Sequence, residues 1–433
     1  MSDPRVPEAP RAGGPTGETD RTALVEAFRA VRGHSAWLCE PLATEDYVLQ
    51  CMAEASPTRW HLAHTTWFFE RFILQEHAPG YVPFDERYYY LFNSYYQALG
   101  PMHKRSNRGL LSRPTVEEVY AYRRVIDERL ATFLERADDV TVRRAAPFVT
   151  LGLNHEQQHQ ELMLTDLLVN LSHNPLLPAY RELDPVEPAE APPARWIPFE
   201  GGVHRIGTDG PGFHYDNEGP CHEVLLRPYA LSARLTTNAE FLAFVEAGGY
   251  EQPEHWLDLG FARVRGEAWE HPLYWFQEDG AWKEFGLGGA APLDPAAPAC
   301  HLSYFEADAF ARWAGHRLPT EAEWEVAAAS RPIAGNLLDA GRFRTVAAAP
   351  DEALQQLFGD VWEWTSSAYA AYPGYRPPPG AVGEYNGKFM CNQYVLRGGS
   401  LATWQDHLRV SYRNFFPPES RWQFAGIRLA KDV

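Results

Sequence analysis

The chain has 433 residues, of which 45% are hydrophobic and 22% charged, a composition typical of a soluble globular protein with two or three domains. Its formal charge of −18 argues against nucleic acid or an anionic membrane surface as the principal partner. The five cysteines show no C-x-x-C spacing and no apolar run could span a bilayer, so we expect a cytoplasmic protein without a disulfide framework or membrane anchor.

Composition divides the chain into four parts. Residues 1–19 are rich in Pro, Gly and Ala and lack the apolar core of a signal peptide, so we expect a disordered leader. Residues 20–173 carry apolar residues at helical spacing and predict a bundle of antiparallel helices. Residues 174–197 are a Pro-rich and acidic linker. Residues 198–433 are rich in Gly and Trp with short strand-like runs, so the predicted fold class is α+β.

Local signals define several helices. Pro57 stands where a helix is expected to begin, and Thr115 with Glu118 has the form of a capping box. The intervening stretch, residues 81–113, is irregular, and a loop of this length in a compact domain is usually functional. The helices expected in the first half cover about residues 24–31, 45–55, 56–75, 115–133 and 146–171, and two more are expected at 237–247 and 304–315.

Two histidines on the last helix of the first half form the start of a metal site. His155 and His159 are four residues apart, which places both imidazoles on one helix face where they can share a metal ion. A third ligand must come from another helix, and His61 and His64 are the candidates. We favour His64 because it lies outside the apolar stripe of its helix, and interpret His61 as a supporting histidine. Zinc would make such a site hydrolytic and Fe(II) would leave room for O2 and substrates, and the residues alone do not choose between them.

Both halves resemble known modules. The run Ser56–Glu70 with His155-x-x-Gln158-His159-x-Glu161 resembles a DinB-like four-helix bundle. The second half resembles the formylglycine-generating-enzyme domain, which has a C-type-lectin-like fold. Together they resemble the ergothioneine-biosynthetic sulfoxide synthases, also called hercynylcysteine S-oxide synthases. The motifs of the second half are Arg317–Glu325, Gly359–Thr365, Leu396–Ser400, Ser411–Phe416 and Gly426–Arg428.

This resemblance implies a reaction and a cofactor. The family uses a non-haem Fe(II) and O2 to join the sulfur of a cysteine derivative to the imidazole C2 of hercynine, Nα-trimethylhistidine. It places the iron on His64, His155 and His159, and by fold analogy a structural Ca²⁺ is expected in the second domain. The resemblance assigns Gln158, Glu161 and Asn414 to hercynine, and Arg105 and Arg108 to the carboxylates of the thiol donor.

Two features of the sequence bear on the thiol donor. Asn414 is followed by Phe415 and Phe416, without the acidic residue that holds the glutamyl group in the branch using γ-glutamylcysteine. The loop run Asn93-Ser-Tyr95-Tyr96 instead resembles the branch that uses free cysteine and takes its active-site tyrosine from this loop. We therefore expect cysteine as the donor, with Tyr95 and Tyr96 as the catalytic tyrosines that donate a proton or hydrogen bond.

Several alternatives stay open at this point. Phe415 and Phe416, with Trp404, are candidates for cation–π contact with a trimethylammonium group, but aromatic residues also form cores. Tyr95 and Tyr96 could instead be packing residues, and Arg105 and Arg108 could instead be exposed surface charges. The rival functions are a synthase using γ-glutamylcysteine or acting at histidine C5 as in ovothiol synthesis, a zinc-dependent DinB-like thiol transferase, and a carbohydrate- or protein-binding module. The oligomeric state is left open.

Overall fold

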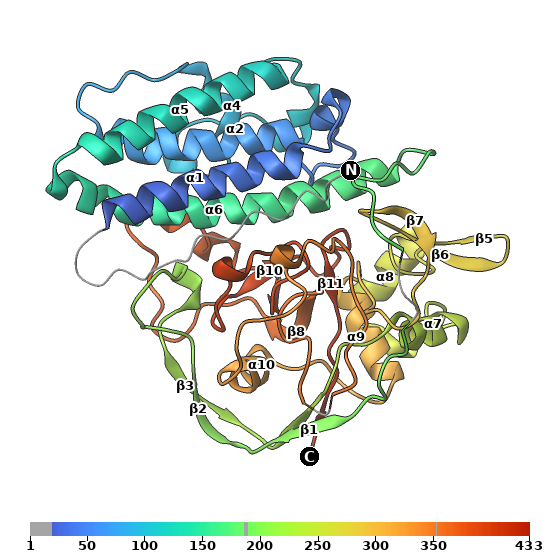
Figure 1. Cartoon of the computed structure of the whole chain (residues 1–433). Helices are drawn as coiled ribbons and strands as arrows, with labels where there is room; N and C mark the ends of the chain where they lie inside the picture. The colour runs from blue at the N-terminus through green and yellow to red at the C-terminus, as the bar shows by residue number, and fades with distance from the viewer. Residues whose placement is uncertain (1–19, 186–188, 352) are drawn as a thin grey trace. The chain divides into compact units, whose positions relative to one another are not determined.

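The computed structural model describes residues 20–185, 189–351 and 353–433, so the expected leader lies outside the described residues. The chain forms two compact units, one helical and one mixed, which confirms the predicted α+β class (Figure 1). The second half of the chain contributes two short segments to the helical unit. Of the described residues, unit 1 comprises 20–175, Gly210–Phe213 and Pro377–Tyr385, and unit 2 comprises those within Leu176–Asp209, His214–Arg376 and Asn386–Val433.

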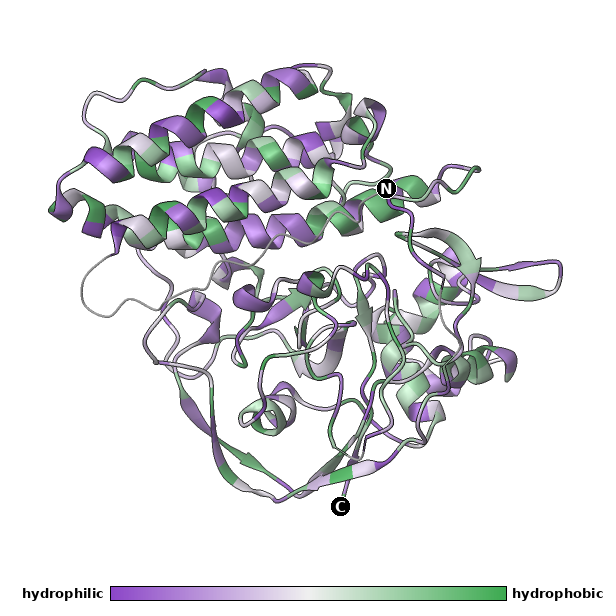
Figure 2. Ribbon diagram, viewed as in Figure 1, coloured by the Kyte–Doolittle hydropathy of each residue, from purple (hydrophilic) through white to green (hydrophobic). Residues whose placement is uncertain are grey.

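Unit 1 is built on long helices that lie side by side (Figure 1). Each carries hydrophobic and hydrophilic residues along its length, as Figure 2 shows, which is the pattern expected of helices that share a core. Thr115 and Glu118 form the predicted capping box, and Asp20 and Asp138 cap two other helices. The long helices are α1 (Arg21–Cys39), α2 (Thr58–Phe69), α5 (Val116–Arg136) and α6 (Asp139–Ser172).

The prediction of a helix over residues 45–55 is wrong. Only a 3₁₀ turn, η1 (Thr44–Val48), forms there. The backbone beyond it is held by side chains instead of by a helical ladder: Cys51 N–H donates to Asn170 Oδ1 at 2.8 Å, and Gln50 Nε2 donates to the Ala55 carbonyl at 2.9 Å. Such side-chain bonds offer the backbone an alternative to a helix.

The expected helix at 56–75 forms with an interruption. After α2 the chain makes one π turn, η2 (Glu70–Leu74), and ends in the short helix α3 (Gln75–His77). Glu70 is fully buried, and its carboxylate accepts hydrogen bonds from the hydroxyls of Tyr81 and Tyr122. The irregular stretch that follows contains three short helices, α4 (Arg87–Phe92), η3 (Gln97–Leu99) and η4 (Arg105–Leu110).

Two features fix α6 against its neighbours. A side chain at Gly152 would lie 2.6 Å from the ring of Phe69, so glycine is needed where α6 approaches the end of α2. Glu156 is buried and accepts hydrogen bonds from Arg32 at 2.8 Å and Arg123 at 2.5 Å. Burial alone would raise the pKa of Glu156, but these two guanidinium groups lower it to about 2. The ion-pair cluster therefore orients the helix next to His155.

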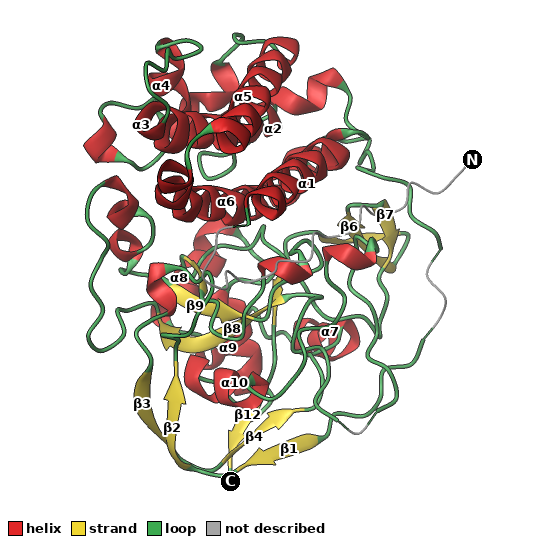
Figure 3. Ribbon diagram, turned by 60° about the vertical axis from the view of Figure 1, so that its left-hand side comes forward, coloured by secondary structure: helices red, strands yellow, loops and turns green. Residues whose placement is uncertain are grey.

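Unit 2 consists of short strands and helices joined by loops (Figure 3). Its four-stranded sheet has the order β10-β9-β8-β11, with β11 parallel to β8 and the other pairs antiparallel. Trp362 and Trp364 on β8 are at most 1% exposed, as expected for core residues. The strands of this sheet are β8 (Trp362–Ala368), β9 (Tyr394–Arg397), β10 (Asn414–Phe416) and β11 (Ala425–Gly426).

Smaller sheets and helices complete unit 2. The sheets β1-β4-β12, β2-β3 and β5-β6-β7 comprise β1 (Trp196–Phe199), β2 (Gly202–Ile206), β3 (His222–Leu226), β4 (Tyr229–Ser232), β5 (Trp275–Glu278), β6 (Ala281–Gly286), β7 (Gly289–Pro292) and β12 (Ala430–Asp432). Helices α7 (Asn238–Glu246) and α9 (Tyr304–Trp313) confirm two predictions, whereas α8 (Asp258–Glu267) and α10 (Glu321–Ala328) are not among the expected helices. The remaining 3₁₀ helices are η5 (Asp216–Glu218), η6 (Pro253–His255), η7 (Leu338–Ala340), η8 (Ala381–Glu384, in the unit 1 segment), η9 (Gly387–Phe389) and η10 (Gln405–His407).

Buried ion pairs use the arginines of the second-half motifs. Arg428 pairs with Glu363 at 2.8 Å, and Arg397 and Arg413 both reach Glu321, all within the core of unit 2. These motif residues thus support the fold.

Part of the expected linker packs within unit 2, since the N–H groups of Tyr180 and Arg181 both donate to the Leu287 carbonyl. Strand β1 also begins inside the expected linker, at Trp196, and residues 186–188 lie outside the described part of the chain. Within the described residues, no helix combines the length and apolarity needed to cross a bilayer.

Candidate metal centre

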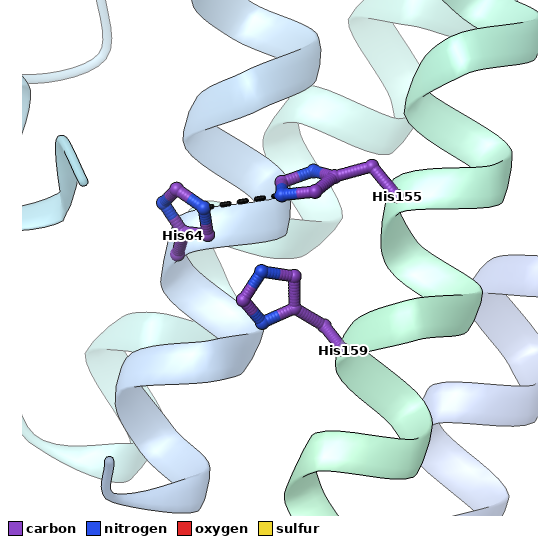
Figure 4. Close-up of side chains that lie close together, drawn as sticks. All are labelled: His64, His155 and His159. Carbon is purple, nitrogen blue, oxygen red and sulfur yellow. Dashed lines mark hydrogen bonds between the residues drawn. The ribbon is translucent and has the colours of Figure 1, made fainter. Parts of the chain in front are cut away.

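The structure brings the three predicted ligands together in unit 1. His155 and His159 on α6 point toward His64 on α2 (Figure 4), and one ring nitrogen of each lies within 4.8 Å of the others. The ring centroids are 5.0 Å apart for His64 and His155, 4.8 Å for His64 and His159, and 4.6 Å for the two residues of α6. Among the described residues, this is the one group of three or more His, Cys, Asp or Glu side chains that converges in this way.

Neighbouring groups fix the ring of His64. Its Nδ1 lies 2.6 Å from the Phe92 carbonyl oxygen, which can only accept, so Nδ1 carries the proton and Nε2 is left bare. The rings of Trp60 and Trp67 stack on it at centroid distances of 4.6 and 5.5 Å. Its Nε2 lies 3.3 Å from Nε2 of His155 (Figure 4), so these two nitrogens face the same point.

All three histidines are held in the neutral form. Burial lowers the pKa of His155 to about 3, and it lowers the pKa values of His64 and His159 well below the ordinary range, with mutual repulsion adding to the effect in these two. A neutral imidazole is the form that binds a metal ion. Three converging neutral nitrogen donors without a carboxylate fit a mononuclear Fe(II) or Zn²⁺ site with open coordination positions.

A tyrosine that sequence reasoning missed stands beside the histidines. The Tyr385 hydroxyl donates a 2.5 Å hydrogen bond to Gln158 Oε1, and its ring centroid is 5.7 Å from that of His155. Its segment, Pro377–Tyr385, belongs to unit 1. The Glu384 carboxylate anchors this segment on η3 by accepting hydrogen bonds from the backbone N–H groups of residues 97 and 98 at 3.1 and 2.9 Å. No local motif marks Tyr385 in the sequence.

The two loop tyrosines have different surroundings. Tyr96 is 5% exposed and packs among the rings of Trp67, Phe68 and Phe72. Tyr95 is 40% exposed and has a left-handed backbone with φ of 65°. Its hydroxyl accepts a hydrogen bond from Arg105. The catalytic role of Tyr95 and Tyr96 stays a prediction. Tyr385 joins them as a third candidate, because its ring contacts His155, one of the three converging histidines that form the histidine triad.

Arg108 is a buried cation beside the site. Its guanidinium lies 3.3 Å from the centroid of the Trp60 ring and donates to the hydroxyls of Ser56 and Ser94, both at 2.9 Å. Burial lowers its pKa to about 9, and repulsion from Arg105 contributes. Arg108 forms no ion pair with a carboxylate within the described parts of the chain. A buried guanidinium in this state is suited to pair with the carboxylate of a ligand.

Comparison of the chain with known proteins shows the family to which it belongs. The DinB superfamily model matches residues 27–163, and the sulfatase-modifying factor enzyme 1-like domain matches residues 184–353 and 345–433. The hercynine oxygenase of Mycolicibacterium smegmatis is 34% identical over 416 residues, covering 87% of this chain and 91% of that protein. The chain belongs to the hercynine oxygenase family. It is therefore an enzyme of the oxygenase class, with a DinB-like bundle and a sulfatase-modifying-factor-like domain.

Two further relatives match different shares of the chain. The hercynine oxygenase of Mycolicibacterium thermoresistibile is 34% identical over 414 residues, covering 87% of this chain and 88% of that protein. The formylglycine-generating enzyme of Thermomonospora curvata is 30% identical over 281 residues, covering 54% of this chain and 93% of that protein. The hercynine oxygenases therefore match both units, whereas the formylglycine-generating enzyme is similar to about half of the chain.

The remaining predicted substrate residues lie in both units. Gln158 contacts Tyr385, and Glu161 is partly exposed on α6 two residues beyond His159. In unit 2, the side chain of Asn414 bonds its neighbour's N–H, Phe415 stacks on Tyr369 at 4.0 Å, and Phe416 lies 6.0 Å from Trp422.

Trp404 is 1% exposed and belongs to the core of unit 2. The expected Ca²⁺ has no acidic cluster of three or more ligands among the described residues and stays a prediction.

Proposed function

We propose that the chain is a non-haem Fe(II)- and O2-dependent sulfoxide synthase that joins the sulfur of cysteine to the imidazole C2 of hercynine and gives hercynylcysteine sulfoxide. The observation that carries the proposal is the convergence of three buried, neutral histidines in a chain that belongs to the hercynine oxygenase family. When bound, the metal supplies open positions for O2 and for the thiol sulfur, and it promotes loss of the thiol proton.

Tyr385 supplies a proton in this proposal. Its hydroxyl is fixed by Gln158 and its ring lies against His155, so the O–H bond is oriented before substrates arrive. A tyrosine in this position can donate its proton or a hydrogen bond to an oxygen atom that gains negative charge during the reaction.

Arg108 binds the carboxylate of the thiol donor. Its two hydroxyl partners, Ser56 and Ser94, are neutral, so the positive charge is available to an incoming anion. Stacking on Trp60, which itself stacks on His64, links the carboxylate site to the metal ligands. Free cysteine is the proposed donor because Phe416 stands where the branch using γ-glutamylcysteine has an acid.

The proposal is tested by loading the chain with Fe(II) under anaerobic conditions and adding hercynine, cysteine and O2. We expect O2 uptake and a sulfoxide product detected by mass spectrometry. Parallel assays with γ-glutamylcysteine, and with histidine in place of hercynine, decide between the related synthases. A strong preference for γ-glutamylcysteine would contradict cysteine as the donor.

A zinc-dependent thiol transferase is the second candidate, because the bundle matches the DinB superfamily and three histidines also suit zinc. The transferase candidate predicts that the Zn²⁺-loaded chain transfers a thiol without taking up O2. This result would refute the proposed oxygenase reaction.

A further inference from the structure

Two buried side chains, His61 and Asp166, lie on the side of His159 that faces away from the other two histidines of the candidate metal site. His61 is 3% exposed, and its Nδ1 lies 2.7 Å from Nδ1 of His159. Its Nε2 lies 3.0 Å from the Oδ2 atom of Asp166, which is also 3% exposed. The three side chains form a continuous row in which His61 of α2 stands between two residues of α6.

Metal binding by His159 would set the direction of the hydrogen bonds in the row. The Asp166 carboxylate can only accept, so the Nε2 atom of His61 donates to it. A metal ion on the Nε2 atom of His159 needs the lone pair of that nitrogen, so the ring proton of a metal-binding His159 lies on Nδ1. The Nδ1 atom of His61, 2.7 Å away, then accepts this proton in a hydrogen bond. The proton of His159 therefore points away from the triad, and its Nε2 atom is left with a free lone pair for a metal ion.

The carboxylate end of the row is itself held in place. Asp166 Oδ2 also accepts a 2.8 Å hydrogen bond from the backbone N–H of Ser56, just before α2 begins. Among the three ligands, His64 obtains the same orientation from the Phe92 carbonyl, whereas Nδ1 of His155 has no partner within the described residues. The row thus gives His159 an orientation that the helix alone does not provide.

We infer that His61 and Asp166 are positioning residues that hold His159 in its metal-binding tautomer and orientation. This inference deepens the proposed function and rests on its metal site. A hydrogen-bond acceptor on the far nitrogen of a histidine ligand also makes that ligand a stronger donor, and here His61 is that acceptor, with Asp166 acting through it. Loss of such a partner typically lowers metal affinity about 10- to 100-fold.

The test uses the full chain with Fe(II) alone as the probe, measured anaerobically by competition with a chelator. His61→Leu is expected to raise the dissociation constant for Fe(II) about 10- to 100-fold. His61→Asn places an amide oxygen close to the former Nδ1 position and is expected to recover most of the affinity. His34→Leu is the matched control, because His34 is an equally buried histidine of the same bundle on α1, and it should leave the affinity unchanged.

A second measurement does not depend on metal or on the variants. The ¹⁵N chemical shifts of histidine-labelled, metal-free wild-type protein report which ring nitrogen of His159 carries the proton. We expect the proton on Nδ1, and a proton on Nε2 would overturn the inference. Unchanged Fe(II) affinity in folded His61→Leu would overturn it as well.

These outcomes are separable from failure of the proposed function. If the wild type binds Fe(II) and His61→Leu weakens binding, but no sulfoxide forms with any thiol, the positioning role stands and the proposed reaction falls.

Discussion

Tyr385→Phe is the substitution that separates the three tyrosine candidates. It removes one hydroxyl and keeps the ring that lies 5.7 Å from the ring of His155. The lost group is the donor of the 2.5 Å hydrogen bond to Gln158 Oε1. The substitution therefore has two separate effects, one on proton donation during the reaction and one on the orientation of Gln158.

The two effects differ in size. Loss of a positioned proton donor lowers turnover about 10²- to 10⁴-fold. Loss of one hydrogen bond to a neutral amide costs about 0.5–1.5 kcal/mol, which corresponds to at most about a tenfold change in the affinity for hercynine. We therefore expect kcat for sulfoxide formation to fall by about 100-fold or more, while KM for hercynine changes by less than about tenfold.

The assay is sulfoxide formation by the Fe(II)-loaded chain under saturating cysteine and O2, with hercynine varied. Tyr95→Phe and Tyr96→Phe are matched controls in the same unit, one on an exposed loop position and one in an aromatic cluster. The reasoning is refuted if Tyr385→Phe keeps kcat within about tenfold of the wild type, which is the size of the hydrogen bond alone. A large loss in Tyr95→Phe or Tyr96→Phe with a normal Tyr385→Phe would return the role to the loop.

Four further predictions rest on the same geometry. His159→Ala should abolish Fe(II) binding, measured by metal content after gel filtration; retained stoichiometric iron would remove it from the ligand set. Arg108→Met should raise KM for cysteine about 100-fold with little change in KM for hercynine, since loss of one member of a buried charged pair costs about 2–5 kcal/mol. Glu384→Ala should lower kcat toward the Tyr385→Phe value by freeing the segment, and Glu384→Gln, which keeps one acceptor, should lie between; an unchanged Glu384→Ala rate would show that the carboxylate is not needed. In the metal-free folded chain the pKa of His155 is lowered to about 3, whereas in the unfolded chain it has its ordinary value of about 6.5. Between these pH values the unfolded state binds a proton that the folded state does not bind. Stability should therefore be lost as pH falls from about 6.5 toward 3, by about 2 kcal/mol at pH 5 for this residue; urea denaturation at pH 7 and pH 5 should show a smaller loss in His155→Gln, and equal losses would contradict the burial argument.

Local periodicity predicted much of the helical unit. Residues four apart on a helix must share a face, so His155 and His159 could be paired from their spacing alone. The Thr115 capping box is a similarly local signal, and the structure contains it. The same signal at Thr320 and Glu323 begins α10, and this helix could have been predicted from it.

Contacts between distant residues could not be predicted in this way. Tyr385 lies in a loop whose sequence carries no periodicity, and tertiary contacts such as that of Glu384 with η3 bring it beside Gln158. The stacking of Arg108 on Trp60 is likewise invisible in sequence, where an arginine is by default a surface residue. The hydrogen bonds that orient His159 depend on Asp166, which lies seven residues, or about two helical turns, further along α6.

Unit 1 is built from segments that are far apart in the sequence, so the ribosome makes its parts at different times. The last of the three converging histidines, His159, is made long before Tyr385, which follows in the second half of the chain. At about 5–20 residues per second, the ribosome needs on the order of 10–45 s to cover that distance. A nascent chain therefore has its three histidines well before its tyrosine. A prematurely terminated product would carry the three converging histidines with His61 and Asp166, but it would lack Tyr385, the proposed proton donor.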